Sequence, residues 1–249
     1  MKRTALLFFF LSGCTPKDQN DKSETDTGAC DTCTDSGDSD SGDSDSGDTD
    51  TPFSPTITGD CGVLDTELTD AQHHLFENVI DFSTSGFDPN SLSESGTRIL
   101  DTDNAGGSSI FSEVYAFEVL LHCETASLLK TETEISYLDS SGKITDLLVD
   151  IDGVKIGVSV TRAFAYPPET PYTEEMAQTL LTKKLEAIQE SSANVAAEDA
   201  WEKQILHVLA YTADHSAQVL SVFDDLPENT KADTILLVTT TEGDDDFMY

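Results

Sequence analysis

Four of the five cysteines are placed where they could pair with one another. Cys30 and Cys33 form the short motif CDTC, and Cys61 and Cys123 lie in the longer, less polar part of the chain that follows. Two thiolates cannot complete a zinc site, and no second pair or nearby histidine accompanies the CDTC motif. We therefore expect a local disulfide between Cys30 and Cys33, and a second disulfide between Cys61 and Cys123 that holds the N-terminal arm of the domain.

A second group of polar side chains lies on two strand-like segments, TDLLVDI and VKIGVSVTRAF. Residues two apart on a strand point to the same face, so Asp146 and Asp150 share a face of the first segment, and Ser159 and Thr161 share a face of the second. Arg162 ends the second segment in a region with few basic residues. It is therefore a candidate to bind an anion or to form an ion pair with Asp146.

Other catalytic signatures are absent from the sequence. It contains no GXSXG, GXXXXGK or GXGXXG motif, and the adjacent histidines at 73 and 74 are not part of an HEXXH pattern. His122, His207 and His215 are scattered along the chain. His207 lies within an apolar run, so we expect a core residue there and not a metal ligand.

The charge of the chain argues against one class of partner. From Gly59 onwards the chain carries 36 acidic and nine basic side chains. A field of that sign repels a phosphate backbone and offers no basic surface along which such a backbone could bind. We therefore do not expect binding to bulk nucleic acid, although divalent cations would weaken the repulsion.

The hydrophobic pattern of the first half predicts two helices separated by a loop. Residues 69–82 begin with a capping threonine and place Leu75, Val79 and Phe82 at helical spacing. Residues 83–107 are rich in Ser, Asp, Asn and Gly and are expected to form a loop. Residues 108–124 place apolar side chains along one stripe and predict a second helix.

The second half predicts three strands and then alternating helices and strands. The three strand-like runs are 128–138, 144–151 and 154–164, with turns at the SSG and DG motifs between them. Helix 173–189, strand 205–211, helix 215–226 and strand 234–240 follow. Continuous apolar strands separated by helices favour parallel pairing. The predicted fold is α/β, with a mixed sheet made of a three-strand antiparallel meander and two further strands, flanked by helices.

This order of elements, over roughly residues 108–241, resembles the PD-(D/E)XK or restriction-endonuclease-like family. The resemblance implies a divalent metal, Mg²⁺ or Mn²⁺, held by an acid at the start of the second strand and by an acid-x-lysine pattern on the third. Asp146 matches the first acid and would be the metal ligand. Ser159 stands where the family has its second acid, and Thr161 stands where it has its lysine.

These departures put catalysis in doubt. Serine is a poor ligand for a hard cation, and threonine lacks the positive charge of lysine. Related families take an acid from the first helix and a lysine from the second, for which Glu113, Glu118 and Lys184 are candidates. Two functions therefore stay open. One is a degenerate domain that binds an unidentified protein or ligand, and the other is a metal-dependent phosphodiester hydrolase with a rearranged site.

The first 13 residues predict an export signal. Lys2 and Arg3 precede an apolar run that is too short to span a membrane, and two small residues follow it. The sequence LSGC that ends at Cys14 resembles the lipobox of bacterial lipoproteins, in which the cysteine is acylated and anchors the chain to a membrane. Thr15 follows the cysteine where an inner-membrane signal would have aspartate, so the resemblance implies the outer membrane of a Gram-negative bacterium. An ordinary secreted protein cut near Gly13 is the alternative.

Residues 14–58 are expected to form an acidic tether. They consist mainly of Asp, Ser, Thr and Gly, with a five-residue repeat of the type SGDSD, and they contain too few apolar residues to build a core. Weak calcium binding by the aspartates is an alternative to a plain spacer, although the pattern of an EF-hand loop is missing. Residues 59–249 then form one globular domain.

Overall fold

The computed structural model describes residues 53–249, apart from residue 85 and residues 103–108. The described residues form one compact unit. The predicted signal, the lipidation site Cys14, the Cys30–Cys33 pair and most of the predicted tether lie outside the described residues, so these expectations stay predictions.

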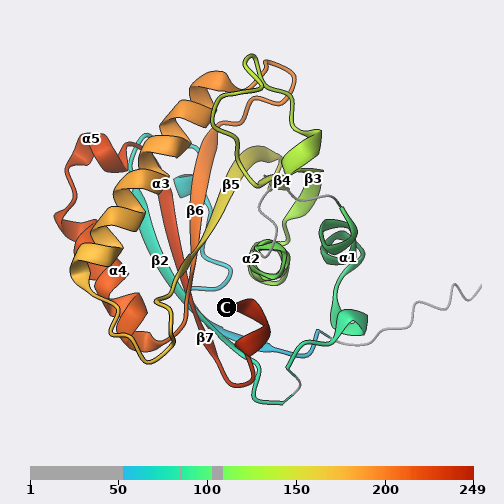
Figure 1. Ribbon diagram of the computed structural model, residues 1–249. Coiled ribbons are helices and arrows are strands. Elements are labelled where there is room, and N and C mark those ends of the chain that lie inside the picture. Colours follow the sequence, from blue (N-terminus) through green and yellow to red (C-terminus); the bar gives the residue numbers. More distant parts are fainter. Residues whose placement is uncertain (1–52, 85, 103–108) are drawn as a thin grey trace, which may run out of the picture. The chain divides into compact units, whose positions relative to one another are not determined.

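The fold is α/β, as expected, and it is built on one mixed seven-stranded sheet (Figure 1). The order across the sheet is β1-β2-β7-β6-β5-β4-β3, in which β2, β7, β6 and β5 are parallel to one another. The strands are β1 (Thr56–Gly59), β2 (His74–Asp81), β3 (Ser127–Thr131), β4 (Leu147–Ile151), β5 (Val154–Ala163), β6 (Lys203–Ala210) and β7 (Ile235–Glu242).

Helices cover both faces of this sheet and create two separate cores (Figure 1). One core lies under α1 (Glu94–Asp101) and α2 (Ile110–Glu124), and the other lies under α3 (Glu174–Asn194) and α4 (Ala213–Asp225). The remaining helices are short, namely α5 (Glu228–Lys231), η1 (Thr66–Leu68), η2 (Pro89–Ser91), η3 (Glu132–Glu134) and η4 (Asp246–Met248). Along β5, Ile156, Val158 and Val160 face the α2 core, as the alternation predicts.

The second half of the chain agrees with the sequence-based prediction. β3, β4 and β5 form an antiparallel meander, and β5, β6 and β7 pair in parallel. The first strand is shorter than expected, because a 3-10 turn begins at Glu132. There Thr131 and Glu134 cap each other, with the Glu134 carboxylate accepting from the Thr131 amide at 2.9 Å.

The first half corrects two predictions. Residues 69–82 do not form a helix, since His74–Asp81 is the strand β2, inserted between β1 and β7. The region predicted to be a loop contains α1, which begins at the N-cap Ser93, whose hydroxyl accepts from the Gly96 amide. Pairing with two neighbouring strands outweighs the helical spacing of the apolar residues.

The sheet also begins earlier than the predicted domain boundary. β1 pairs antiparallel with β2 from Thr56 to Gly59, so three residues assigned to the tether belong to the sheet. The expected disulfide between Cys61 and Cys123 is present, and it joins the segment after β1 to the end of α2. Among the described residues, no helix combines the length and apolar character needed to cross a bilayer.

Candidate functional site

The ladder between β4 and β5 stops halfway along β5. The last pair is Leu147 with Val158, and the Asp146 amide still donates to the Val158 carbonyl at 3.1 Å. Beyond this point the next β5 amide that faces β4, that of Val160, is bound by a side chain. It donates to Oδ2 of Asp146 at 2.6 Å. Asp146 therefore ends the ladder and occupies a position that a further β4 carbonyl would have taken.

Lys184 completes this arrangement from helix α3. Its Nζ donates to the Val160 carbonyl at 2.8 Å, so the amide and the carbonyl of one residue are bound by two opposite charges. Burial raises the pKa of the Asp146 carboxyl to about 6, and the nearby Lys184 ammonium opposes part of that rise. The structure thus brings together Asp146 and Lys184, two of the residues that the sequence proposed for catalysis.

Ser159 belongs to a neutral hydrogen-bond network on the same face of the sheet. Its hydroxyl lies 3.0 Å from the Thr145 hydroxyl, which lies 3.5 Å from Oε1 of Gln204. The Gln204 amide donates in turn to the hydroxyls of Ser191 and Ser192, both at 2.9 Å. Ser159 is buried and engaged in this network, and Thr161 is half-buried two residues further along β5.

The two acids proposed on the first helix lie elsewhere. Glu113 and Glu118 are carried by α2, which covers the opposite face of the sheet. Glu118 is fully buried and accepts from the Ser93 amide at 2.9 Å and from the Ser93 hydroxyl at 2.8 Å. Glu113 accepts from the Ser109 hydroxyl at 2.9 Å. Neither side chain can join Asp146 in one site, and Glu118 instead anchors the start of α1.

The residues around Asp146 do not fit the divalent metal that the resemblance implies. A hard cation needs several oxygen ligands, usually with more than one carboxylate. Within the described part of the chain, no group of three or more His, Cys, Asp or Glu side chains is placed to hold a metal ion. One oxygen of Asp146 is also committed to the Val160 amide, so this carboxylate is poorly placed to serve as the main ligand of a cation.

Arg162 lies past this point, near the carboxyl end of β5. It donates from Nη1 to the Met248 carbonyl at 2.6 Å, and among the described contacts it forms no ion pair with Asp146, contrary to one expectation. Two cavities of about 450 and 440 Å³ share Arg162 and Phe164. The first is also lined by Tyr172, Glu175, Met176, Thr179, Leu180 and Lys183, and the second by Ile110, Phe111, Phe247, Met248 and Tyr249. Arg162 therefore stands between two hollows, which suits its predicted role towards an anion.

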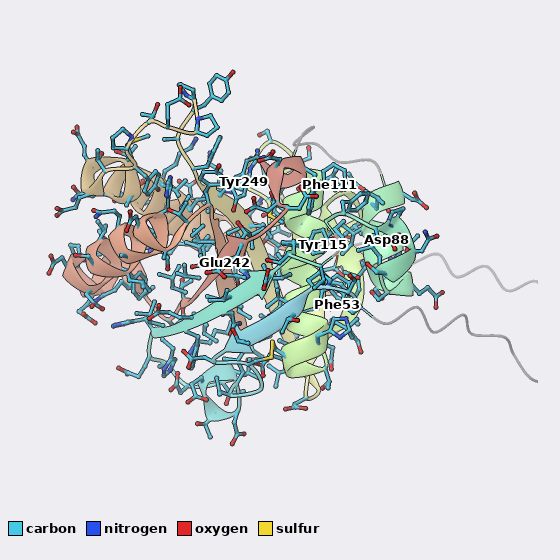
Figure 2. All side chains as sticks on the ribbon, turned by 90° about the horizontal axis from the view of Figure 1, so that it is seen from below. Phe53, Asp88, Phe111, Tyr115, Glu242 and Tyr249 are labelled. Carbon is cyan, nitrogen blue, oxygen red and sulfur yellow. A yellow bond between two sulfur atoms is a disulfide. The ribbon has the colours of Figure 1, made fainter. Side chains whose placement is uncertain are left out.

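Aromatic rings surround this end of the sheet. Figure 2 looks onto it and shows Phe111 of α2 and Tyr249 on this side of the molecule. Phe164 packs against Tyr211 and Tyr249, with ring centroids 5.2 and 5.0 Å away. The Tyr249 hydroxyl lies 2.9 Å from the hydroxyl of Thr241 on β7. Sequence reasoning missed these rings, although Phe164 and Tyr211 are the last residues of two predicted strands and directly follow the observed strands β5 and β6.

Two buried polar atoms beside the first cavity have no partner among the described residues. They are the Tyr172 hydroxyl and Nε2 of His215, and the two rings are stacked with centroids 4.8 Å apart. The other His215 nitrogen, Nδ1, lies 2.6 Å from the Thr212 hydroxyl. Burial raises the pKa of Tyr172 to about 12 and lowers that of His215, so both side chains favour their neutral forms.

His207 confirms the expectation of a core histidine. It is fully buried in β6, and its Nε2 lies 2.7 Å from the Thr239 hydroxyl on β7. Burial lowers its pKa to about 3, so it is neutral at physiological pH. His207 is therefore not a candidate for proton transfer at neutral pH.

Comparisons with known proteins do not place the chain in a family. No family model matches it, and no solved structure does so either. The chain is similar to the AAC-rich mRNA clone AAC4 protein of Dictyostelium discoideum, with 42% identity over 153 residues. The match covers 59% of this chain and 22% of the relative, so it spans about a fifth of that protein's length.

Proposed function

We propose that the chain is a lipid-anchored cell-envelope protein whose restriction-endonuclease-like domain acts by binding and not by cleavage. The observation that carries the proposal is that Asp146 and Lys184 both bind main-chain groups of the domain itself. Both side chains are committed to the main chain of Val160, where they end the β4 ladder. Residues that would act on a substrate in the resembled family here serve the structure of the strand.

Further features of the fold and of the sequence support this proposal. The order α2, β3, β4, β5, α3 and β6 follows the pattern of the resembled family. The positions of its second acid and its lysine hold Ser159, bound in a neutral network, and Thr161. The excess of acidic side chains disfavours a nucleic-acid substrate. The lipobox-like LSGC motif supports the anchor, and Thr15 supports the outer membrane of a Gram-negative bacterium as its location.

A phosphodiester hydrolase is the second candidate, and one observation favours it. Burial raises the pKa of Asp146 to about 6, and the Lys184 ammonium contributes to the same environment. A carboxyl with such a pKa can exchange a proton near neutral pH, as a general base must. The alternative would require Asp146 to leave the Val160 amide when substrate binds.

A nuclease assay separates the two candidates. The protein is incubated with single- and double-stranded DNA in Mg²⁺ or Mn²⁺, and Asp146→Asn is compared with wild type. Asp152→Asn is the matched control, because Asp152 is exposed in the turn after β4 and asparagine tolerates its positive φ of 52°. We expect no metal-dependent cleavage by any of the three proteins. If wild type and Asp152→Asn cleave DNA and Asp146→Asn does not, the domain is a hydrolase and the binding proposal is wrong.

The anchor is tested independently. In bacteria fed a labelled fatty acid, we expect the wild-type protein to carry the label and to sediment with membranes, and Cys14→Ser to do neither. Mass spectrometry of the mature N-terminus reports the acyl groups directly. An unmodified cysteine would contradict the proposed lipid anchor and would not bear on the proposed binding role of the domain.

A further inference from the structure

The two halves of β5 have different surroundings. From Val154 to Val158 the strand pairs with β4 on one side, and from Ile156 to Ala163 it pairs with β6 on the other. Beyond Val158 the β4 side is left without a strand among the described residues, and Figure 1 shows β4 beside one end of β5 only. The carboxyl half of β5 is thus an internal strand on one side and an edge strand on the other.

The main chain of Arg162 faces this open side. Successive residues of a strand present their amide and carbonyl groups to opposite edges. The Val160 groups point to the β4 side, where Asp146 and Lys184 bind them, and the Ala163 carbonyl accepts from the Tyr211 amide on the β6 side. Arg162 is two residues after Val160, so its amide and carbonyl point to the β4 side as well.

A cavity lies on each side of this open edge. The cavity of about 450 Å³ is lined by Met176 and Leu180 of α3, and the one of about 440 Å³ by Phe111 of α2 and by Phe247. Arg162 and Phe164 line both. An extended chain laid along β5 would direct successive side chains to opposite faces, which means alternately into one cavity and the other.

Positive charge gathers at the same place. Three of the nine basic side chains that follow Gly59, those of Arg162, Lys183 and Lys184, lie along the open half of β5 or on the facing side of α3. Glu175 lines the first cavity together with Arg162 and Lys183, and the Asp146 carboxylate lies beside Lys184 at Val160. The charged side chains that line the two cavities are therefore two basic and one acidic, which is a local excess of positive charge in a domain that is acidic as a whole.

We propose that the open half of β5 binds a segment of another protein as an added strand. The segment is extended, places apolar side chains alternately into the two cavities and brings a carboxylate to Arg162. Its main chain pairs with the amide and the carbonyl of Arg162, as in other cases of strand addition. The inference rests on the proposed binding function and names its partner.

The test begins by selecting ligands from a random decapeptide library displayed on phage. The target is the full chain with Cys14→Ser, which keeps it free of acyl groups. We expect enriched peptides with alternating apolar residues and at least one acid, and fluorescence anisotropy then gives their dissociation constants. Arg162→Glu should weaken binding at least tenfold. Lys183→Glu should weaken it several-fold, and it serves as a second variant because Lys183 is exposed on α3. Lys143→Glu, an equal charge change at an exposed site outside both cavities, should leave binding unchanged.

Main-chain pairing has its own readout. Methylation of single amide nitrogens in a selected peptide should abolish binding at the one position whose amide donates to the Arg162 carbonyl, because the Val160 groups are already bound by Asp146 and Lys184. Equal tolerance at every position would overturn strand addition. So would a failure to enrich any peptide, or equal binding by Arg162→Glu and Lys143→Glu.

Two competitors test other occupants. Displacement of the probe by a synthetic peptide of residues 31–50 would assign the edge to the chain's own N-terminal segment, and displacement by single-stranded DNA would assign it to nucleic acid. Either result would overturn the inference. A negative peptide result leaves the nuclease assay untouched, so failure of this inference and failure of the proposed function are distinguishable.

Discussion

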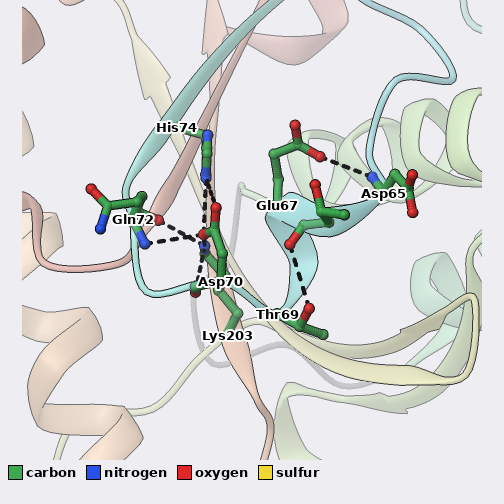
Figure 3. Close-up of polar contacts among 8 residues, drawn as sticks. Asp65, Glu67, Thr69, Asp70, Gln72, His74 and Lys203 are labelled. Carbon is green, nitrogen blue, oxygen red and sulfur yellow. Dashed lines mark hydrogen bonds and ion pairs between the residues drawn. The ribbon is translucent and has the colours of Figure 1, made fainter.

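The two ends of the parallel strands are built in opposite ways. At the amino end, Lys203 of β6 is 2% exposed and its ammonium donates to Asp70 Oδ1 at 2.7 Å, to the Asp70 carbonyl at 3.1 Å and to the Gln72 carbonyl at 2.7 Å (Figure 3). His74 binds the same Asp70 carboxylate, with Nε2 2.8 Å from Oδ2. Every donor of the buried ammonium is satisfied, which its burial requires.

A disulfide and a buried carboxylate reinforce the same end. Cys61 is bonded to Cys123 at the end of α2. The neighbouring Glu124 accepts from the amides of Gly62 at 2.9 Å, Val63 at 3.3 Å and Leu64 at 3.2 Å. The segment between β1 and β2 is therefore fixed by a covalent bond and by a cluster of charge-assisted hydrogen bonds.

Cavities lie at both ends, and they differ in what surrounds them. The cavity at the amino end, of about 370 Å³, is lined by Lys203, whose donors are all satisfied, whereas the two at the carboxyl end, of about 450 and 440 Å³, both border Arg162. Arg162 donates from Nη1 to a main-chain carbonyl of the C-terminal segment, and the cavities beside it leave part of its surroundings open. Stability is unequal across a fold, and binding surfaces are drawn from its less constrained parts. The difference teaches that the bonds at the amino end hold this domain together, and the carboxyl end is where we propose that a partner binds.

The largest effect is expected from opening the disulfide. Cys61→Ala with Cys123→Ala should lower the free energy of unfolding by about 4 kcal/mol, because the bridge closes a loop of 62 residues. Urea denaturation followed by circular dichroism measures this loss. Peptide binding at Arg162 should persist in the folded fraction. A loss below 1 kcal/mol would show that the bridge does not hold the amino end.

Removing the buried cation comes next. Lys203→Met should cost about 3 kcal/mol, since the partly exposed Asp70 carboxylate and two main-chain carbonyls lose the buried ammonium as their donor. Lys143→Met is the matched control, because Lys143 is exposed, and it should change stability by less than 0.5 kcal/mol. If the two variants lower the free energy of unfolding equally, the bonds of Lys203 at the amino end do not stabilise the domain more than an exposed lysine does.

The pH dependence of stability sharpens the comparison near Val160. The pKa of Asp146 is about 6 in the fold and about 3.9 in an unfolded chain, so between these values the native state binds more protons. The contribution of Asp146 to the free energy of unfolding therefore falls as pH rises from about 4 to 6 and is constant above. Asp146→Asn should remove this fall, which we place at about 2 kcal/mol given the partial exposure of the side chain.

The measurement is a series of urea titrations between pH 4 and pH 7. The difference between wild type and Asp146→Asn should change across this range, and the difference between wild type and Asp152→Asn should stay flat. A flat difference for both variants would mean that the Asp146 carboxyl titrates as it does in water.

The smallest effect on stability is expected at the carboxyl end. Arg162→Gln removes one hydrogen bond to a main-chain carbonyl and keeps most of the side-chain volume, so it should cost less than about 1 kcal/mol. The same variant should weaken the selected peptides at least tenfold in the anisotropy assay. If Arg162→Gln instead lowers stability and binds the selected peptides as tightly as wild type, Arg162 stabilises the fold and does not bind the partner.

The strands and helices from α2 onwards could be predicted because they carry clear local signals. β4, β5, β6 and β7 are apolar runs bounded by turns, and α3 begins with a capping threonine and two acids. The prediction for β2 was wrong because the strand contains the buried polar residue Asn78. This residue hides the alternation of buried positions that it forms with Ile80 and with Phe82, just after the strand. The neighbours that make β2 a strand lie far away in the sequence, on β7.

The sequence could predict which residues belong to the candidate site, but it could not predict what each of them binds. The sheet alternation correctly separated Ser159 from Ile156, Val158 and Val160, which face the α2 core. That Asp146 and Lys184 would both bind the main chain of Val160 depends on where β4 ends, and no residue type marks that point. The cavities depend on side chains as distant in sequence as Phe111, Phe164 and Phe247, which meet only in the folded chain.

The position of β1 has a mechanical consequence for the lipid anchor that we propose. β1 is a four-residue edge strand, antiparallel to β2, and it begins where the N-terminal segment joins the domain. Tension on that segment would load the pair at Thr56 and open its hydrogen bonds one after another, in the manner of a zipper. Unravelling would then meet the bridge at Cys61, two residues after β1, which transfers the force to α2 and the sheet core.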